Sequence, residues 1–407
     1  MRQALEHLRV LDLTRIFAGP WSTQMLADLG ARVIKIERPV RGDDTRSWGP
    51  PFLKDAQGDE TRESSYFMAV NRGKESVTVD ISTPEGQELI REIAKTADIV
   101  VENYKVGDLK RYGLDYESLS ALNPRLVYCS ITGYGQTGPY AELPGYDFVF
   151  QGMGGLMSIT GKPDEEPGGG PIKFGLAISD LATGMYATAA ILSAIEHRHI
   201  SGKGQYIDMS LLDSTVSLTS YMSMNYFFSD QVPKRMGNVH TNIVPYQVFR
   251  CKEGDIIMAV GNDSQFKDMC RSIGMPELAE DPRFKASADR VRNRLDLIPI
   301  LDEAMLAKTM MEWVDIFEAN NVPCGPIYML DQVFEDVQVK HRQMKSSLKH
   351  PIGVDVPIVS NPIRLSDTPV QLKNPAPLLG QHTEHVLKGE LGLSDEQIQG
   401  LRDRGIL

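Results

Sequence analysis

The sequence predicts an α/β fold built around a parallel sheet. An apolar, strand-like segment at residues 9–14 leads into a helical segment that Gly30 ends, and a second strand follows at residues 31–37. Strand, helix and strand in this order form a βαβ unit, whose two strands run parallel. Three later apolar segments of strand length predict that the sheet continues: residues 76–81, 98–103 and 126–131.

Length and composition are those of an ordinary globular protein. The chain has 407 residues, of which 42 % are hydrophobic and 24 % charged, and its net charge is −11. This acidic balance, without a basic run, argues against a nucleic-acid partner. We find no apolar run long enough to cross a bilayer and no signal or presequence pattern, so we expect a cytoplasmic protein. The four cysteines lie far apart without metal-ligand spacing, so we expect reduced, structural thiols.

The first βαβ unit predicts where a ligand binds. Ligands of parallel sheets lie beyond the carboxyl ends of the strands. This rule places Arg15, Phe17 and Arg38 on one rim of the sheet. No G-x-G-x-x-G motif follows the first strand, so a dinucleotide site is not supported.

The next segments are a long loop and a well-marked helix. Residues 42–65 are polar and are predicted to form a loop, and loops of this length in compact domains often carry function. Thr83 and Pro84 predict a helix start, with Thr83 as the cap and Pro84 at the first helical position. After the strand at residues 126–131, residues 132–139 form a glycine-rich loop.

A carboxylate at the start of an apolar helix is the main chemical signal in the chain. Asp180 follows the glycine-rich residues 168–171 and precedes apolar residues at three- and four-residue spacing. At this position a carboxylate lies at the positive end of the helix dipole, and an ionised carboxylate in a dry pocket can act as a nucleophile. The alternative is that Asp180 or Ser179 caps the helix.

The second half of the chain predicts a smaller domain. Residues 211–228 form an apolar helix that we expect in the core or at a subunit interface. The composition shifts at residues 229–233. From about residue 248, a strand, a hairpin turn, a second strand and helices follow to about residue 320. Residues 321–327 are the predicted connection back, and a last helix begins near residue 379.

Several segments agree with one protein family in their order and spacing. They are Leu11-Asp-Leu-Thr-Arg-Ile-Phe-Ala-Gly-Pro20, Val33-Ile-Lys-Ile-Glu-Arg38, Gly133-Tyr-Gly-Gln-Thr-Gly-Pro139, the Asp180 segment and Pro377-Leu-Leu-Gly-Gln-His-Thr383. Together they span nearly the whole chain. The sequence resembles the class III coenzyme A transferases, the formyl-CoA and carnitine CoA-transferase family.

The resemblance implies a domain organisation. It implies a Rossmann-like large domain that contains both chain ends, with a smaller α+β domain inserted. We expect residues 1–225 to form the first part of the large domain, residues 226–325 the small domain, and residues 326–407 the linker and the return to the large domain. The resemblance also implies an interlocked homodimer, whose two chains are threaded through each other like links.

The resemblance implies a covalent mechanism as well. Asp180 would attack an acyl-CoA thioester and then carry CoA as an aspartyl thioester, until an acceptor acid takes its place. CoA is then a substrate and not a permanently bound cofactor, and no metal is expected. The residues implied to line the CoA site are Arg15, Ile16, Phe17, Ala18, Arg38, Arg72, Lys74, Asn103, Tyr104, Arg111, Tyr146 and Asp147. The cations among them suit CoA phosphates.

Within the family, the resemblance is closest to the succinyl-CoA:dicarboxylate group, which includes the glutarate transferases. Residues 42–51, 131–139, 179–184 and 243–247 carry it. Formyl-CoA transferases have a glutamine at the place of Phe17 and a glycine run in the small domain that is missing here, which speaks against oxalate and formate. We expect succinyl-CoA as donor and glutarate as first acceptor. A cation must hold the second carboxylate, and the candidates are Arg46, Arg235 and His240.

Two other functions stay open. The 2-methylacyl-CoA racemases share the fold, and they use a histidine in a Gly-His-Asp stretch together with an aspartate at the place of Asp180. Here Tyr146 stands in that stretch, and a phenol is a poor proton shuttle at neutral pH; His240 is a possible substitute. The other alternative is a non-catalytic CoA-binding subunit, against which Asp180 and its glycine-rich approach argue.

Overall fold

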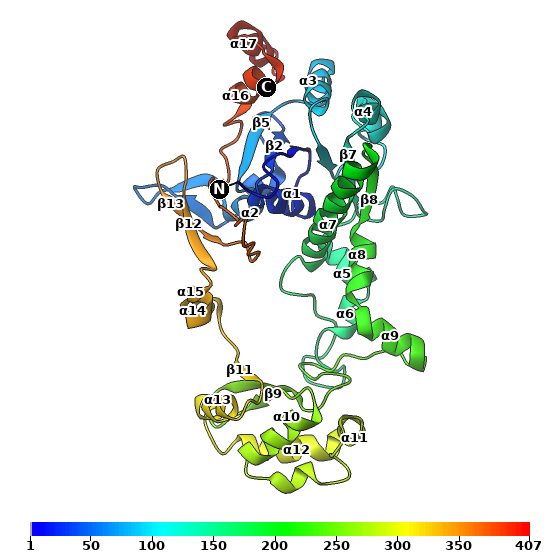
Figure 1. Cartoon of the computed structure of the whole chain (residues 1–407), viewed down its shortest axis with the longest axis vertical. Coiled ribbons are helices and arrows are strands. Elements are labelled where there is room, and N and C mark those ends of the chain that lie inside the picture. Colours follow the sequence, from blue (N-terminus) through cyan, green and yellow to red (C-terminus); the bar gives the residue numbers. More distant parts are fainter. Residues whose placement is uncertain (1) are drawn as a thin grey trace. The chain divides into compact units, whose positions relative to one another are not determined.

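The structure, a computed structural model, describes residues 2–407 and divides into two compact units (Figure 1). The larger unit takes the residues up to Leu156, Lys173–Phe228 and Gln338–Leu407. The smaller unit takes Met157–Ile172 and Ser229–Val337.

A six-stranded sheet forms the centre of the larger unit, in the order β5-β2-β1-β6-β7-β8. All neighbouring strands in it run parallel, which confirms the predicted α/β fold with a parallel sheet. The chain first adds β2 and β5 on one side of β1 and then β6, β7 and β8 on the other, so the order reverses between β1 and β6. Such a switch point is where ligands of open sheets bind. The strands are β1 (Arg9–Asp12), β2 (Arg32–Glu37), β5 (Lys74–Thr78), β6 (Ile99–Glu102), β7 (Val127–Thr132) and β8 (Tyr206–Ser210).

Each face of this sheet carries an apolar core. Leu11 and Val10, adjacent in β1, belong to different cores because successive strand residues point to opposite faces. The first core includes side chains of α3 (Pro84–Ala94), α4 (Tyr116–Leu122), α16 (Thr383–Leu391) and α17 (Asp395–Asp403). The second includes side chains of α1 (Ala18–Asp28), α5 (Asp147–Met153), α7 (Ile178–Ser201) and α8 (Leu211–Leu218). Helices on both faces are the usual environment of a parallel sheet.

Shorter elements complete this unit. Two antiparallel hairpins are present, β3 (Phe52–Lys54) with β4 (Glu60–Ser64) and β12 (Lys345–Lys349) with β13 (Asp355–Val359). Helix α2 (Ser65–Val70) packs in a small apolar cluster with residues of β3 and β13. Two 3-10 helices, η1 (Asp44–Ser47) and η2 (Lys110–Tyr112), also belong to this unit. Three further helices each contain a point where the chain passes from one unit to the other: α6 (Leu156–Ile159), α9 (Ser220–Ser229) and α15 (Val337–His341).

Two segments differ from the sequence prediction. The predicted loop at residues 42–65 contains η1 and the hairpin β3–β4, because β4 is a polar strand with an exposed face and so has no apolar run to reveal it. The predicted helix at residues 211–228 is two helices, α8 and α9. Ser220 has a φ of +41°, a left-handed backbone that interrupts the helical hydrogen bonds there.

Helix α7 corrects the expectation that no segment is long and apolar enough to cross a membrane. By length and composition alone, α7 is such a helix among the described residues. Half of its most apolar stretch is buried within the chain, where it packs against α1, β7 and β8. A core helix has the same length and composition, so the apolar character of α7 is explained by packing.

The C-terminal residues return to the edge of the sheet at β5. The N–H of His382 donates to the carbonyl of Ser76 (2.9 Å), and the N–H of Thr78 donates to Oγ1 of Thr383 (3.0 Å). The sequence predicts one last helix, whereas the structure has two. Gly392, with a φ of +65°, ends α16 before α17 begins.

The smaller unit has its own antiparallel sheet and core. The strand order is β11-β10-β9, and residues 157–172, which the sequence-based ranges leave in the large domain, belong to this unit. Its elements are β9 (Tyr246–Arg250), β10 (Asp255–Ala259), α10 (Asp263–Ser272), η3 (Pro276–Ala279), α11 (Ser287–Arg292), α12 (Arg294–Met305), α13 (Met310–Ala319), β11 (Cys324–Pro326) and α14 (Leu330–Glu335). Phe249, Phe266 and Phe317 are fully buried in its core.

Candidate functional site

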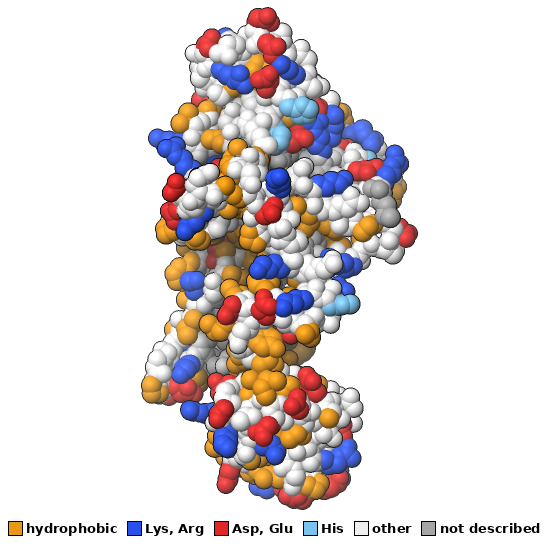
Figure 2. All heavy atoms as spheres, turned by 90° about the vertical axis from the view of Figure 1, so that its left-hand side faces the viewer, with side chains coloured by type: hydrophobic (Ala, Val, Ile, Leu, Met, Phe, Trp, Pro, Cys, Tyr) orange, Lys and Arg blue, Asp and Glu red, His pale blue; other side chains and the backbone are white. Residues whose placement is uncertain are grey.

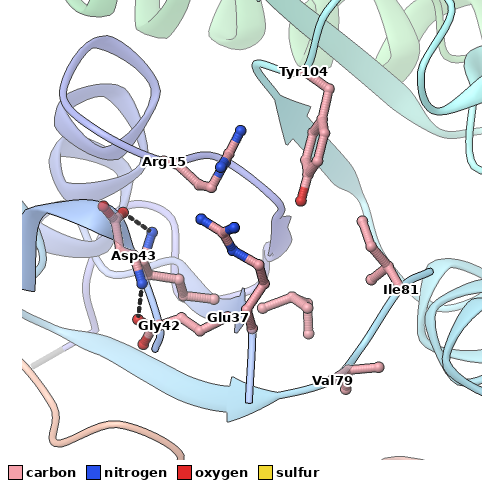
Figure 3. Close-up of a pocket in the computed structure, with 10 residues that line it drawn as sticks. Arg15, Glu37, Gly42, Asp43, Val79, Ile81 and Tyr104 are labelled. Carbon is pink, nitrogen blue, oxygen red and sulfur yellow. Dashed lines mark hydrogen bonds and ion pairs between the residues drawn. The ribbon is translucent and has the colours of Figure 1, made fainter. Parts of the chain in front are cut away.

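A small pocket lies at the carboxyl ends of β1, β2 and β6, where the strand order reverses. Arg15 follows β1, Arg38 follows β2 and Tyr104 follows β6. Figure 3 shows Arg15 and Tyr104 directed toward the same space, with Val79 and Ile81 along one side. We call this the rim pocket; its lining residues are Arg15, Lys35, Ile36, Glu37, Arg38, Gly42, Asp43, Val79, Ile81 and Tyr104.

Positive charge gathers at the rim pocket. The guanidinium of Arg15 lies over the ring of Tyr104, 5.1 Å from its centroid, and its Nη1 is 3.2 Å from Oδ2 of Asp44. The guanidinium of Arg38 donates to the other oxygen of the same carboxylate at 2.8 Å. The structure therefore brings together the two arginines that the sequence places on one rim.

The loop between β1 and α1 is held by side chains from other elements. The side-chain amide of Asn103 accepts from the N–H of Arg15 (2.9 Å) and donates to its carbonyl (2.7 Å). The carboxylate of Asp43 accepts from the N–H of Ile16 (3.2 Å), and Lys35 donates to the carbonyl of Thr14 (2.8 Å). Ile16 has a φ of +71°, which is strained for a β-branched residue and needs such support.

A network of buried ion pairs adjoins the rim pocket, and two of its members, Lys35 and Asp43, line that pocket. Lys35 pairs with Asp43 (3.0 Å) and Lys74 with Asp12 (3.1 Å), and none of these four side chains is exposed. Burial lowers the pKa of Lys74 to about 8. Burial alone would raise the pKa of Asp12, but Lys74, Lys35 and two hydroxyl donors hold it at about 2. Both groups of this pair therefore carry charge at neutral pH.

Two predicted site arginines are also engaged inside the protein. Arg46 donates through Nε and Nη2 to Glu37, both at 2.8 Å, and through Nη2 to the carbonyl of Pro377 (3.0 Å). Arg72 forms a two-point ion pair with Asp28, whose shorter distance is 2.5 Å. The guanidinium groups of Arg46 and Arg72 therefore serve internal contacts in this structure.

Asp180 lies in the first turn of α7, but it does not cap the helix. The N-cap residue is Ala177, and no side chain within the helix start makes a capping bond. The carboxylate of Asp147, which does not belong to α7, caps the helix instead. It accepts hydrogen bonds from the N–H of Ser179 (2.7 Å) and of Asp180 (3.4 Å). The alternative that Asp180 or Ser179 is simply a cap is therefore wrong. The Asp180 carboxylate makes no capping bond and is available for a chemical role.

The surroundings of Asp180 raise its pKa to about 7. Burial is the largest cause, the negative charge of Asp147 adds to it, and a backbone hydrogen bond from Ala18 opposes it. Burial, followed by Asp180 and Asp147, also raises the pKa of Tyr66. A carboxylate of this kind is more basic, and thus a stronger nucleophile, than an exposed one.

Close packing of α1 against α7 places Ala18 beside Asp180. Gly184 is essential to this approach, because a Cβ at its position would come within 2.6 Å of the carbonyl oxygen of Ala18. One turn further on, the hydroxyls of Ser22 and Thr188 are 3.0 Å apart. The two helices therefore begin side by side, with the N–H of Ala18 donating to the Asp180 carboxylate and the N–H groups of Ser179 and Asp180 donating to Asp147.

A cavity of about 1180 Å³ within the larger unit opens beside Asp180. Three aromatic rings form part of its wall, with Tyr66 edge-on to both Phe17 (5.4 Å between centroids) and Trp48 (5.0 Å). The indole N–H of Trp21, another lining residue, has no hydrogen-bond partner among residues 2–407. The wall is mostly apolar, so the cavity suits an acyl chain.

Several of these residues were missed by the sequence analysis. Trp48, Asp43 and Asp44 lie within the predicted loop at residues 42–65, and Tyr66 directly follows it. The available signal was aromatic side chains in an otherwise polar loop. The acidic pair directly after Arg38 was the other signal.

The remaining predicted residues are distributed over both units. Tyr146 and Asp147 line the cavity, and Ala18 touches Asp180. Arg111 is exposed, 3.4 Å from Asp108 and stacked over Tyr112. Arg235 and His240 belong to the smaller unit: Arg235 pairs with Asp164 and donates to the carbonyl of Ser158 (3.3 Å), and the ring of His240 packs against Tyr246.

Comparisons with known proteins agree on one family. A family model described as CoA-transferase family III matches residues 5–383. The succinate–glutarate CoA-transferase of Agrobacterium fabrum is 46 % identical over 383 residues, which are 94 % of this chain and 94 % of that protein. The succinyl-CoA:glutarate CoA-transferase of Homo sapiens is 42 % identical over 403 residues, 99 % of this chain and 90 % of that protein. Among solved structures, a CAIB/BAIF family protein from Brucella suis is 47 % identical with a TM-score of 0.82, covering 96 % of this chain and all of that one.

Proposed function

The chain belongs to CoA-transferase family III, and we propose that it moves CoA from succinyl-CoA to glutarate. Asp180 is the observation that carries this proposal. Its carboxyl has a pKa of about 7, lies where two helices begin, and faces a largely apolar cavity. The relatives named above are transferases, so the racemase and the non-catalytic subunit are set aside.

In the proposed reaction, the Asp180 carboxylate first attacks the thioester carbonyl of succinyl-CoA. The C–S bond breaks, which leaves a succinyl–aspartyl anhydride and the CoA thiolate. The thiolate attacks the aspartyl carbonyl, so that succinate leaves and CoA is held as an aspartyl thioester. Glutarate then repeats the two steps in reverse order, which yields glutaryl-CoA and restores the carboxylate. No net proton is consumed, and each step exchanges one acyl bond for another.

The residues around Asp180 have defined parts in this scheme. Asp147 holds the first turn of α7, and it keeps Asp180 basic through its charge. The N–H of Ala18 donates to the Asp180 carboxylate at the start, and it is placed to donate to an oxyanion when that carbonyl is attacked. The aromatic wall formed by Phe17, Trp48 and Tyr66 limits the access of water to the anhydride.

The rim pocket is the proposed place for the phosphates of CoA. Arg15 and Arg38 present guanidinium groups there, and arginine pairs strongly with phosphate oxygens. Ile16, Asn103 and Tyr104 shape the loop and wall next to them, and Arg111 stays a further proposed contact. Arg72 and Lys74 are buried and bonded to Asp28 and Asp12, so we assign them a supporting part.

The distal carboxylate of glutarate needs a cation. Arg46 is held by Glu37 inside the larger unit, so it is not the proposed partner. Arg235, whose side chain is 14 % exposed, and His240 stay the proposed residues. A monocarboxylate of the same length lacks the second carboxylate that would pair with Arg235, so the proposed site discriminates against it.

We further propose an interlocked homodimer in which both chain ends contribute to the larger unit, and Met157–Ile172 and Ser229–Val337 form the inserted smaller unit. Apolar side chains lie exposed between charged ones on the face drawn in Figure 2. Large exposed apolar residues of the chain include Phe227, Phe228, Leu330 and Val337. Such surfaces support a partner chain that covers them. A cytoplasmic location stays part of the proposal.

The proposed mechanism is tested by trapping the covalent intermediate. Enzyme incubated with succinyl-CoA should show, by mass spectrometry, CoA attached to the peptide that contains Asp180. Asp180→Ala should lose both the adduct and turnover, since no other carboxylate replaces the nucleophile. Asp147→Asn is the control, because it changes the neighbouring carboxylate and should keep the adduct. Near-normal turnover by Asp180→Ala would refute the mechanism.

A further inference from the structure

One carboxylate, that of Asp44, bridges both arginines of the rim pocket. Its Oδ2 lies 3.2 Å from Nη1 of Arg15, and its Oδ1 lies 2.8 Å from Nη2 of Arg38. Arg15 follows β1 and Arg38 follows β2, so the bridge joins two neighbouring strand ends. Asp44 itself was not among the residues that the sequence pointed to.

The other charged groups of the pocket already have partners. Lys35 is paired with Asp43, and Glu37 is paired with Arg46. Arg15 and Arg38 therefore share a single negative charge, which leaves an excess of positive charge at the opening. The three side chains are accessible, since Arg15 is 32 %, Arg38 44 % and Asp44 45 % exposed.

The backbone around Asp44 is fixed without help from its carboxylate. Asp43 is the N-cap of η1 and accepts from the N–H of Thr45 (3.0 Å), and the hydroxyl of Ser47 donates to the carbonyl of Asp44 (2.9 Å). The Asp44 side chain can consequently turn away from the arginines while the turn keeps its shape.

We propose that Asp44 stands in for a phosphate group of CoA, and that CoA binding displaces its carboxylate from Arg15 and Arg38. This inference rests on the proposed function. Exposed ion pairs contribute little, whereas a phosphate offers more charge and three acceptor oxygens to the same two guanidinium groups. Replacement of the Asp44 carboxylate by the phosphate is therefore favourable, but breaking the two ion pairs of Asp44 reduces the net free energy of CoA binding. Asp44 weakens the binding of CoA, and it neutralises the arginines when the CoA product leaves.

The test is the affinity of the Asp44→Asn variant for CoA. Calorimetric titration with CoA at low ionic strength should give a Kd that is roughly threefold to tenfold lower than that of the wild type. The Kd of the variant should also rise more steeply with salt, because two uncompensated cations then face the phosphate. In steady-state assays the same change should appear in KM for succinyl-CoA rather than in kcat.

Two variants separate this effect from a general change of charge. Asp44→Glu keeps a carboxylate in reach of the arginines and should return Kd close to the wild-type value. Asp281→Asn removes the same charge from a partly exposed aspartate paired with Arg283 at 2.8 Å, and it should leave Kd unchanged. An Asp44→Asn variant that binds CoA equally or more weakly would overturn the inference, since Asp44 would then have no effect or would contact CoA directly. Failure of the wild type to bind CoA would instead overturn the proposed function.

Discussion

Opposing influences act on the carboxyl of Asp180. Its place in the first turn of α7 and the N–H of Ala18 favour the ionised form. Burial and the charge of Asp147 favour the protonated form, and the resulting pKa of about 7 shows that they prevail. A helix terminus contributes only about 0.3–1 kcal/mol at an ordinary surface site, which is too little to offset burial. The protein thus keeps a basic carboxylate that is still substantially ionised at neutral pH.

This pKa predicts the pH dependence of the reaction. Only the ionised Asp180 can attack, so kcat/KM should reach its plateau well above pH 7, should be half-maximal near the pKa of about 7 and should fall further in acid. Asp147→Asn removes a neighbouring negative charge and should move this acid limb to lower pH. Initial rates at limiting succinyl-CoA, measured between pH 5 and 9 in buffers of constant ionic strength, give the midpoint.

Asp403→Asn serves as the control for that profile. Asp403 is exposed in α17 and accepts a hydrogen bond only from Gln399 among the described contacts. Its removal changes the net charge equally and should leave the midpoint in place. An Asp147→Asn midpoint that stays at the wild-type value would show that Asp147 does not act on Asp180.

Arg46 is expected to matter for stability rather than for substrate choice. Arg46→Ala leaves Glu37, which is almost fully buried, without its cation, and the free energy of unfolding should fall by about 3 kcal/mol at pH 7. Arg46 holds the pKa of Glu37 below its ordinary value against the opposing effect of burial. The stability that the pair contributes is thus present above pH 4.5 or so and is lost as the pH falls, so variant and wild type should converge in acid.

Urea unfolding at pH 7 and at pH 4 measures both parts of this prediction. Arg283→Ala is the matched control, because it removes an exposed arginine from an ion pair of similar geometry and should change stability little. Arg46→Ala should retain its preference for glutarate over valerate, whereas Arg235→Ala should lose most of it. Loss of that preference in Arg46→Ala, with unchanged stability, would return Arg46 to the acceptor site.

The sequence predicts the surroundings of a site residue only when its contacts come from nearby positions in the chain or from a general rule of the fold. Arg15 and Arg38 follow strands directly, so the sheet rule places them together. Arg72 and Lys74 are cations of the same kind, but their partners Asp28 and Asp12 precede them by more than forty residues. Such pairing cannot be predicted from the sequence, because the pairing depends on which strands become neighbours in the sheet.

At the scale of elements, the contact of α1 with α7 positions the reaction centre. Ala18 is the first residue of α1, Asp180 lies in the first turn of α7, and Gly184 allows the two helices to touch one turn below. A small residue is needed there, because the neighbouring atom is a backbone oxygen that cannot move aside.

Gly184→Ala should therefore impair both stability and catalysis. Alanine favours a helix by about 1 kcal/mol, but the overlap with the Ala18 carbonyl costs more, so we expect a net loss of about 2 kcal/mol. Separation of the helices also moves Asp180 from the Ala18 N–H, and kcat should fall by roughly tenfold or more. Thermal unfolding and steady-state rates measure the two effects.

Gly389→Ala provides the opposite case in another helix. Gly389 lies inside α16, and nothing would meet a Cβ there within 4 Å. This variant should gain up to about 1 kcal/mol and keep full activity. Equal behaviour of the two variants would show that the space around Gly184 does not control the site.

The apolar character of each element explains which strands and helices the sequence predicted. The central strands are largely buried and rich in β-branched and other apolar residues, so β1, β2, β6 and β7 appear as short, mostly apolar segments. Strand β4 is polar and half solvated, and α8 and α9 share one apolar pattern that the left-handed Ser220 divides. The first error arises because β4 has no apolar run, and the second because the backbone conformation of Ser220, which composition does not reveal, divides the helix.

At the scale of the whole molecule, the proposed interlocked dimer predicts how slowly its two chains exchange partners. Chains that are threaded through each other cannot separate unless one of them opens. Tagged and untagged protein, mixed in the native state and incubated for a day, should form no mixed dimers that the tag can capture. Joint unfolding and refolding of the same mixture should produce them. Free exchange at high dilution, or a monomer in size-exclusion chromatography, would contradict the threaded arrangement.

The return of the C-terminal residues to β5 sets an order of events during biosynthesis. The ribosome releases the chain from its N-terminus, so β1, β2 and β5 emerge long before residues 382–407 can cover them. The core on that face lacks Val386, Ile398 and Ile406 until residues 382–407 have been synthesised. The smaller unit, whose last strand ends at Pro326, can close during this interval. Until then, the nascent larger unit has an open sheet edge and an exposed apolar surface. We expect it to depend most on chaperones at this stage.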